Sequence, residues 1–129
     1  VNMRRSRLGN ANLSGADCAS SNFVECDLRG TNLQGANLWQ SSLRHSNASH
    51  ANLIDTNLSE ADLQNINLRH ADMTQTNFRQ AVLQGAKLNY ANMQRCKLWR
   101  ANLENAELKE TKLQNLKGLD LKGKRCLIR

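Results

Sequence analysis

Residues 51–63 read ANLIDTNLSEADL, a five-residue unit that begins with a small residue and carries leucine at its third position. The leucines Leu53, Leu58 and Leu63 are therefore five residues apart. On an α-helix a five-residue step turns by about 140°, so these leucines would scatter around the helix and form no apolar stripe. The order small–polar–leucine instead alternates inward and outward positions, as extended backbone does. The stretch predicts short extended steps separated by turns.

The same unit recurs along almost the whole chain. From Leu8 to Leu113 the five-residue frame has 22 positions, of which sixteen are Leu, two Phe and two Met, and the exceptions are Cys18 and Ala48. Two residues before these positions, 21 of the 22 residues are Ala, Ser, Thr or Cys, and the exception is Ile66. A chain that repeatedly takes a short step and turns forms a coil, and stacked coils bury leucines that one coil alone leaves exposed.

Four segments match a known consensus as they stand: ANLSG (11–15), TNLQGANL (31–38), ANLIDTNLSEADL (51–63) and ANLENAEL (101–108). In these segments, and over roughly residues 6–115, the sequence closely resembles the pentapeptide-repeat family. The resemblance implies an all-β fold, a right-handed quadrilateral parallel β-helix with four pentapeptides in each twenty-residue coil. The 22 repeats would then form a solenoid of about 5.5 coils. The resemblance also favours a bacterial source, because such repeats abound in cyanobacteria.

The repeat defines the expected domain organisation. Residues 1–115 are predicted to form the pentapeptide-repeat β-helix, and the rhythm begins so early that we expect a fragment of a longer protein. The rhythm fails after Leu113, and a bare terminal coil is an open sheet edge. Residues 116–129 are therefore interpreted as a C-terminal cap, a dimerising end or a link to a missing domain, and a homodimer through a solenoid end is one expected assembly.

A twenty-residue coil places residues n and n+20 one above the other. One inward column then contains Leu28, Ala48 and Leu68, and Ala48 leaves a gap of leucine-to-alanine size. Ile66, the oversized residue at a small position, belongs to the coil after Ala48. We predict that Ile66 points inward and fills this gap. Phe78 occupies a leucine position and completes the predicted core set.

The same arithmetic separates His45 from His50, although the two are close in sequence. His50, His70 and Tyr90 are twenty residues apart and are predicted to form one surface ladder. Two imidazoles about 5 Å apart could share a proton, bind a transition metal weakly or stack. A metal site would need a third ligand and supporting partners. We therefore predict a surface ladder, with no metal and no cofactor.

Two tryptophans occupy an exposed position on one face, three coils apart. Trp99 is surrounded by basic residues, and the chain has no acidic residue between Met73 and Leu103. An exposed tryptophan often anchors a partner, and basic charge beside an aromatic residue is the footprint of a nucleic acid or another anionic partner. A solvated face is the simpler alternative. The predicted interaction surface consists of Trp39, Arg79, Arg95, Lys97, Trp99 and Arg100.

Composition limits the classes of function. The formal net charge is +7, there is no run of 18 apolar residues, and the four cysteines have no metal-ligand spacing. These features predict reduced thiols, a cytoplasmic location and no transmembrane segment. No phosphate-binding glycine loop or nucleophile elbow is present, so no catalytic residue is assigned and the segment is predicted not to be an enzyme. A fused catalytic domain outside the segment stays an open alternative.

The predicted function is a non-catalytic rigid scaffold for protein–protein interaction, which could be one domain of a larger signalling or effector protein. The alternative is binding of nucleic acid or an anionic surface through the basic patch at 79–100. The best-known members of the family mimic DNA and protect gyrase from quinolones. That activity needs an acidic rod, so the net charge of +7 argues against gyrase as the partner.

Overall fold

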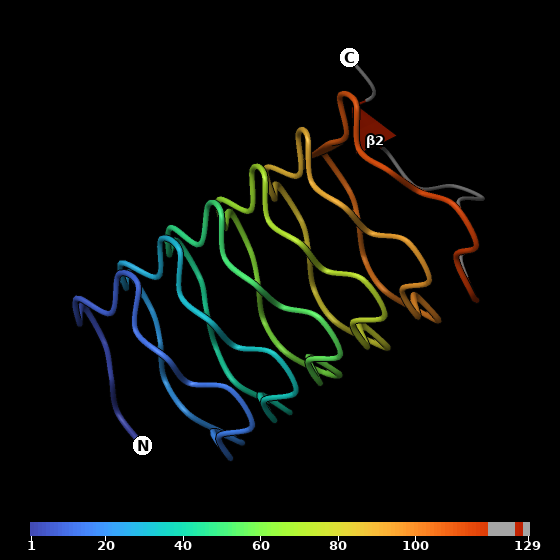
Figure 1. The fold of residues 1–129 in the computed structure, drawn as a ribbon. Helices are drawn as coiled ribbons and strands as arrows, with labels where there is room; N and C mark the ends of the chain where they lie inside the picture. Colours follow the sequence, from blue (N-terminus) through green and yellow to red (C-terminus); the bar gives the residue numbers. More distant parts are fainter. Residues whose placement is uncertain (119–125, 128–129) are drawn as a thin grey trace.

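Parallel pairing between residues twenty apart organises the chain. The computed structural model describes residues 1–118 and 126–127. Isolated parallel bridges join residue n to residue n+20, from Asn2↔Asn22 to Lys97↔Lys117. The two regular strands, β1 (Ala106–Glu107) and β2 (Cys126–Leu127), pair in the same register, with Ala106 opposite Cys126. Successive coils therefore stack into a rod, with the N-terminal coil in blue at one end (Figure 1).

A tight turn closes every pentapeptide, and one backbone conformation recurs at its fifth position. Within residues 1–118, nineteen non-glycine residues have φ between 54° and 63°, and His50 is one of them. A β-turn of type II requires a positive φ at its third residue. The amide of Ala51 donates to the carbonyl of Ala48 at 3.1 Å, as equivalent residues do in other turns, and the His50 amide donates to the Arg69 carbonyl in the next coil. Bonding between coils therefore holds conformations that non-glycine residues rarely adopt.

The preference for Asn and Asp before the leucine has a direct structural cause. The side-chain oxygen of Asn52 accepts a hydrogen bond from the amide of Ile54 at 3.1 Å. The same bond, from the amide two residues later, recurs at other positions of this kind, for example at Asn77 with the amide of Arg79. An Asx-type bond of this sort preorganises a turn. The polar residue of each repeat thus directs the corner that follows it.

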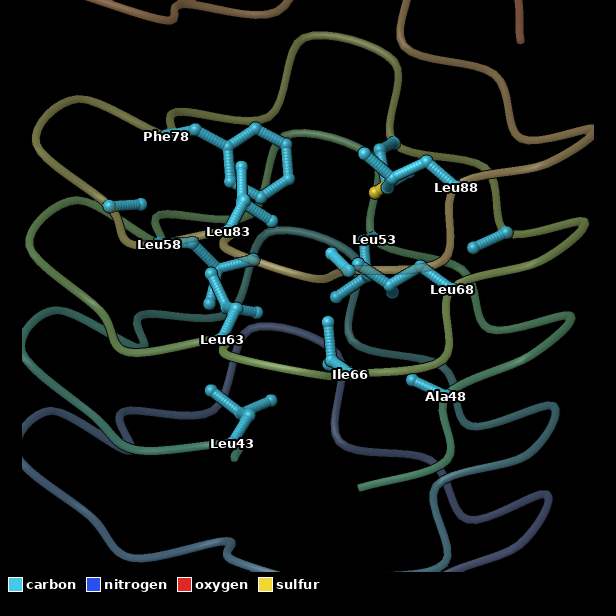
Figure 2. Close-up of a cluster of buried hydrophobic side chains, with 14 of the residues drawn as sticks. Leu43, Ala48, Leu53, Leu58, Leu63, Ile66, Leu68, Phe78, Leu83 and Leu88 are labelled. Atoms are coloured by element: carbon cyan, nitrogen blue, oxygen red, sulfur yellow. The ribbon is translucent and has the colours of Figure 1, made fainter. Parts of the chain in front are cut away.

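The leucines and the small residues fill the interior. The residues predicted from the sequence as core each have an exposed fraction of 0–1%: Leu28, Ala48, Ile66, Leu68 and Phe78. Ile66 is completely buried, and Figure 2 shows its side chain and that of Ala48 in the same part of the core. Threonine hydroxyls and cysteine thiols bond to the backbone of the preceding coil, for example Thr56 Oγ1 to the Leu33 carbonyl at 2.7 Å, whereas the hydroxyls of Ser41 and Ser46 donate to the carbonyl three residues earlier. No buried side-chain nitrogen or oxygen in the described residues lacks a partner.

The twenty-residue register continues beyond the predicted end of the repeats. Lys117 pairs with Lys97, and β2 pairs with β1. Gly118 interrupts the pattern, because it has a φ of 68° at a position that is leucine in most repeats. The predicted cap or link at 116–129 falls largely on 119–125 and 128–129, which lie outside the described residues. Within the described part of the chain, no helix is long and apolar enough to cross a bilayer.

Candidate interaction face

One side of the rod carries both exposed tryptophans. We call it the tryptophan face and define it by the residues 16–20, 36–40, 56–60, 76–80, 96–100 and 116–118. The second residue of each of these pentapeptides projects outward, because its neighbours on either side point into the core. The fourth and fifth residues form the turn at the edge of the face. Equivalent positions in neighbouring coils are therefore about 4.8 Å apart along this face.

Trp99 lies beside a groove near the C-terminal end of the face. Its side chain is 48% exposed, and the guanidinium carbon of Arg100 lies 4.5 Å from the ring centroid, in cation–π geometry. A Cβ atom on Gly118 would come within 3.0 Å of the Trp99 Cβ, so only glycine lets the backbone lie this close. The groove has a volume of about 630 Å³ and is lined by Arg79, Gln80, Lys97, Trp99, Lys117 and Gly118.

A second hollow adjoins the groove at the edge of the face. It has a volume of about 490 Å³ and is lined by Asp55, Gln75, Arg95, Lys97, Asn115 and Lys117. Lys97 and Lys117 line both hollows and thus form the boundary between them. Asp55 is the acidic residue of the second hollow, whereas the described residues that line the groove beside Trp99 include no carboxylate.

Lys97 and Lys117 lie in neighbouring coils and place two positive charges one above the other, and we call this pair the lysine stack. Among the isolated bridges of residues 1–118, Lys97↔Lys117 is the one that joins two ionised residues of the same sign, whereas Arg7↔Asp27 and Lys87↔Glu107 join opposite charges. Like charges in directly opposed positions are destabilising. Neither lysine has an ion-pair partner in the described part of the chain. Their charge is therefore left for solvent or for a ligand.

Ion pairs neutralise cations on other sides of the rod. The five pairs found within residues 1–118 join Arg4 and Arg5 to Glu25, Arg29 to Asp27, Arg44 to Asp62, and Arg69 to Glu107. None of these residues belongs to the tryptophan face. Among residues 1–118, positive charge without an ion-pair partner thus collects around Trp99.

Trp39 has different surroundings. Its side chain is 40% exposed, and its Nε1 donates to Oε1 of Glu60 at 3.5 Å. Glu60 also accepts a hydrogen bond from Gln40 at 2.9 Å. Trp39 lies three coils, about 14 Å, from Trp99 along the rod. The tryptophan face therefore changes from acidic beside Trp39 to basic beside Trp99.

The structure brings most of the predicted surface together. Arg79, Lys97 and Trp99 line one groove, and Arg95 joins Lys97 in the adjoining hollow. Arg100 contacts the Trp99 ring, while Trp39 lies apart from this group. Sequence reasoning missed Lys117, Gly118 and Gln80. The available signal for Lys117 was its position twenty residues after Lys97.

The aromatic rings of the expected ladder are stacked face to face. The ring centroids of His50 and His70 are 4.8 Å apart, those of His70 and Tyr90 are 5.1 Å apart, and the planes differ by 4° and 6°. Imidazole lone pairs lie in the plane of the ring, so two rings stacked face to face do not converge on one metal ion. Within residues 1–118 and 126–127, no group of three or more His, Cys, Asp or Glu side chains could hold a metal.

The most perturbed carboxyl lies outside the tryptophan face. Hydrogen bonds from the Arg29 side chain, and then from the Arg29 amide, lower the pKa of Asp27 to about 2. The guanidinium of Arg29 donates at 2.9 and 2.7 Å to the two carboxylate oxygens. A carboxylate held so firmly in its ionised form is a poor general acid or base near neutral pH. The shift is explained by this ion pair.

The buried thiol of Cys96 is expected to resist alkylation. Burial raises its pKa to about 12, and Sγ donates to the Met73 carbonyl at 2.9 Å. The reactive thiolate is then about one part in ten thousand at pH 8. Iodoacetamide labelling followed by mass spectrometry should modify half-buried Cys18 well before Cys96, and Cys96 should react only when urea unfolds the chain. Equal labelling rates of these two thiols in the folded protein would contradict the prediction.

Comparisons with known proteins agree with this repeat architecture. The family model described as "Pentapeptide repeat region" matches residues 16–93, and the model described as "Pentapeptide repeats (8 copies)" matches residues 90–123. Among curated proteins, none matches the chain.

Several solved structures resemble this chain. Rfr23, a pentapeptide repeat protein from the cyanobacterium Cyanothece, is 31% identical, with a TM-score of 0.72 and 86% of each chain covered. QnrB1, a plasmid-mediated fluoroquinolone resistance protein, is 17% identical, with a TM-score of 0.51, covering 100% of this chain and 83% of its own. HetL, involved in heterocyst differentiation regulation in the cyanobacterium Nostoc, is 24% identical, with a TM-score of 0.49, covering 95% of this chain and 79% of its own. The first two likenesses show the shared fold.

Proposed function

Because this chain belongs to the pentapeptide repeat family, we propose that it is a non-catalytic rigid scaffold that binds a protein partner through its tryptophan face. The proposal includes the finer geometry expected for the family, a right-handed four-sided β-helix of about 5.5 coils. It also includes a cytoplasmic location. In a repeat protein each coil contacts only its neighbours, so a long, regularly spaced surface is available for binding.

The groove beside Trp99 is the observation that carries this proposal. Hot spots of protein interfaces are enriched in tryptophan and arginine and lie in well-packed pockets. Trp99 is half exposed, is stacked by Arg100 and borders a groove of about 630 Å³. The net charge of +7 argues against gyrase binding by DNA mimicry, since a mimic of DNA has to be acidic.

Affinity capture from a cell extract tests the proposal. We expect the wild-type chain to retain a defined set of proteins and Trp99→Ala to lose them, with at least a tenfold fall in affinity. Tyr90→Ala is the matched control, because Tyr90 is 42% exposed but belongs to the aromatic stack on another side. If Trp99→Ala retains the same proteins as the wild type, this face is not the binding surface.

A second candidate function is binding of nucleic acid. The observation that favours it is the absence of acidic residues between Met73 and Leu103, a stretch that contains five basic ones. Binding to single strands should then weaken with salt, with a slope of about −0.7 for each phosphate contacted. A deoxythymidine oligonucleotide titrated at several salt concentrations measures this slope, and no detectable binding at low salt rejects the candidate.

A further inference from the structure

We propose that the groove beside Trp99 binds an acidic, extended segment of a protein. Carboxylates of this segment would lie against Lys97 and Lys117, and an apolar side chain would lie against the Trp99 ring. The inference rests on the proposed function, since it takes a protein partner as given and specifies the chemistry of that partner. Three observations support it, namely the lysine stack, the distribution of the ion pairs and the charge gradient along the face.

The lysine stack follows a ladder of asparagine side chains in the same column of residues spaced twenty apart. In the column that leads to Lys97, the side-chain amide of Asn57 donates to Asn37 at 3.2 Å, and that of Asn77 donates to Asn57 at 3.5 Å. Each amide donates to one neighbour and can accept from the next, so the ladder satisfies itself. Lysine ammonium groups can only donate. At Lys97 and Lys117 the column therefore presents two adjacent donors of equal charge, which an oxyanion of the carboxylate kind satisfies.

The charge around Trp99 is not balanced from within the described chain. The ion pairs of residues 1–118 all lie off the tryptophan face. Asp55 lines the hollow on the far side of the lysine pair, where it disfavours a second carboxylate. On the groove side, the lining residues that the structure describes include Arg79 and the two lysines but no carboxylate. The anion is therefore best placed in the groove, where the Trp99 ring is also within reach.

The length of the basic region of the tryptophan face, from Arg79 to Lys117, fits a short peptide motif. From Arg79 to Lys117 the face rises by two coils, about 10 Å. This length corresponds to about three residues of extended peptide. In such a segment side chains two positions apart point to the same side, so an acidic residue on the lysines and an apolar residue two positions away on the ring can face the groove together. Exposed strands and extended peptides are commonly recognised in this way.

The same face disfavours a nucleic acid. One coil beyond Arg79 a strand that followed the rod would meet Glu60, and the two exposed tryptophans are separated by about 14 Å. Proteins that bind single strands place successive aromatic platforms along a continuous basic track. Here one ring lies in the basic region, and Arg100 already stacks on it. A short acidic segment fits between Arg79 and Lys117, whereas a polymer that is negative along its whole length would also meet Glu60.

Tryptophan fluorescence provides a direct test. Trp39→Phe leaves Trp99 as the sole tryptophan, since the chain has two. The probe is the synthetic hexapeptide Glu-Ser-Leu-Ser-Glu-Ser, in which glutamate and leucine are two positions apart, titrated at low salt. We expect saturable quenching or a spectral shift of Trp99, and an affinity at least tenfold weaker in Lys97→Gln and in Lys117→Gln. Lys87→Gln should bind like the parent, because Lys87 is stacked on Glu107 on another face.

The outcomes separate this proposal from the broader one. The four substituted residues are all exposed: Trp39, Lys87, Lys97 and Lys117. Circular dichroism and the midpoint of urea denaturation check that each variant stays folded. Unchanged affinity in both lysine variants, or tighter binding of a deoxythymidine oligonucleotide than of the peptide, overturns the acidic-peptide assignment. If the captured protein partner depends on Trp99 but the hexapeptide neither binds nor competes with it, the scaffold function stands and this inference fails.

Discussion

Phe78→Ala is expected to lower the free energy of unfolding by about 3–5 kcal/mol. Phe78 is the largest of the fully buried side chains, with none of its surface exposed. Truncation removes its apolar surface from the core and leaves a cavity between coils that pair through the backbone, where collapse is limited. Its amide donates to the Lys97 carbonyl at 2.8 Å, so the cavity would adjoin a residue that lines the groove beside Trp99. Urea denaturation monitored by circular dichroism measures the loss.

Phe78→Leu is the control for this prediction. Leucine is the residue found in most equivalent positions of the chain, so it should fit the same site with a smaller loss than alanine. Since each coil contacts only its neighbours, the alanine variant should loosen the C-terminal coils and weaken peptide binding as well. An alanine variant as stable as the leucine variant would mean that the Phe78 ring contributes little to packing.

Ile66→Ala should cost about 2–5 kcal/mol, and Ala48→Leu should cost about 1–3 kcal/mol by overpacking. We predict that the double variant recovers much of the combined loss, because a leucine at 48 can occupy the space that Ile66 vacates. Both residues are buried, and Figure 2 shows them in the same part of the core. Urea denaturation of the single and double variants gives a double-mutant cycle.

The sign of the coupling decides whether Ile66 compensates for Ala48. Residues that share a cavity usually show interaction energies of about 0.5–3 kcal/mol, whereas independent sites add. Ala48→Leu combined with Leu28→Ala in the same column gives a comparison that does not involve Ile66. Additive losses for Ile66→Ala and Ala48→Leu would falsify the compensation.

The fold could be predicted from the sequence because a single spacing repeats. The leucine frame gave the buried positions, and the twenty-residue coil implied by the family resemblance gave the register between Lys97 and Lys117. The positive φ at positions such as His50 was not predicted, because the residues there are chemically diverse. Their shared conformation comes from bonds between coils and from the Asx turn, and the glycines that signal a positive φ occupy only a few of these positions, for example Gly15 and Gly85.

The site could be predicted only in part, and particular residues show why. Gly118 stands where the frame requires a leucine, so the repeat seemed to end there and Lys117 was left out of the surface. Trp39 was grouped with Trp99, although Trp39 donates a hydrogen bond to the side chain of Glu60 in the neighbouring coil. Which long side chains meet depends on their rotamers, and these are not determined by the spacing of the repeat.

The uniform register has a consequence for how this chain reaches its native state. Every backbone bridge in residues 1–118 closes a loop of the same twenty-residue length. The entropy lost on closing such a loop is modest and does not grow along the chain, unlike that of sheets whose partner strands are distant in sequence. Once two neighbouring coils have formed, each further coil can add to the growing end at a similar cost. A longer rod of this kind would therefore require no contact of longer range than this one already makes.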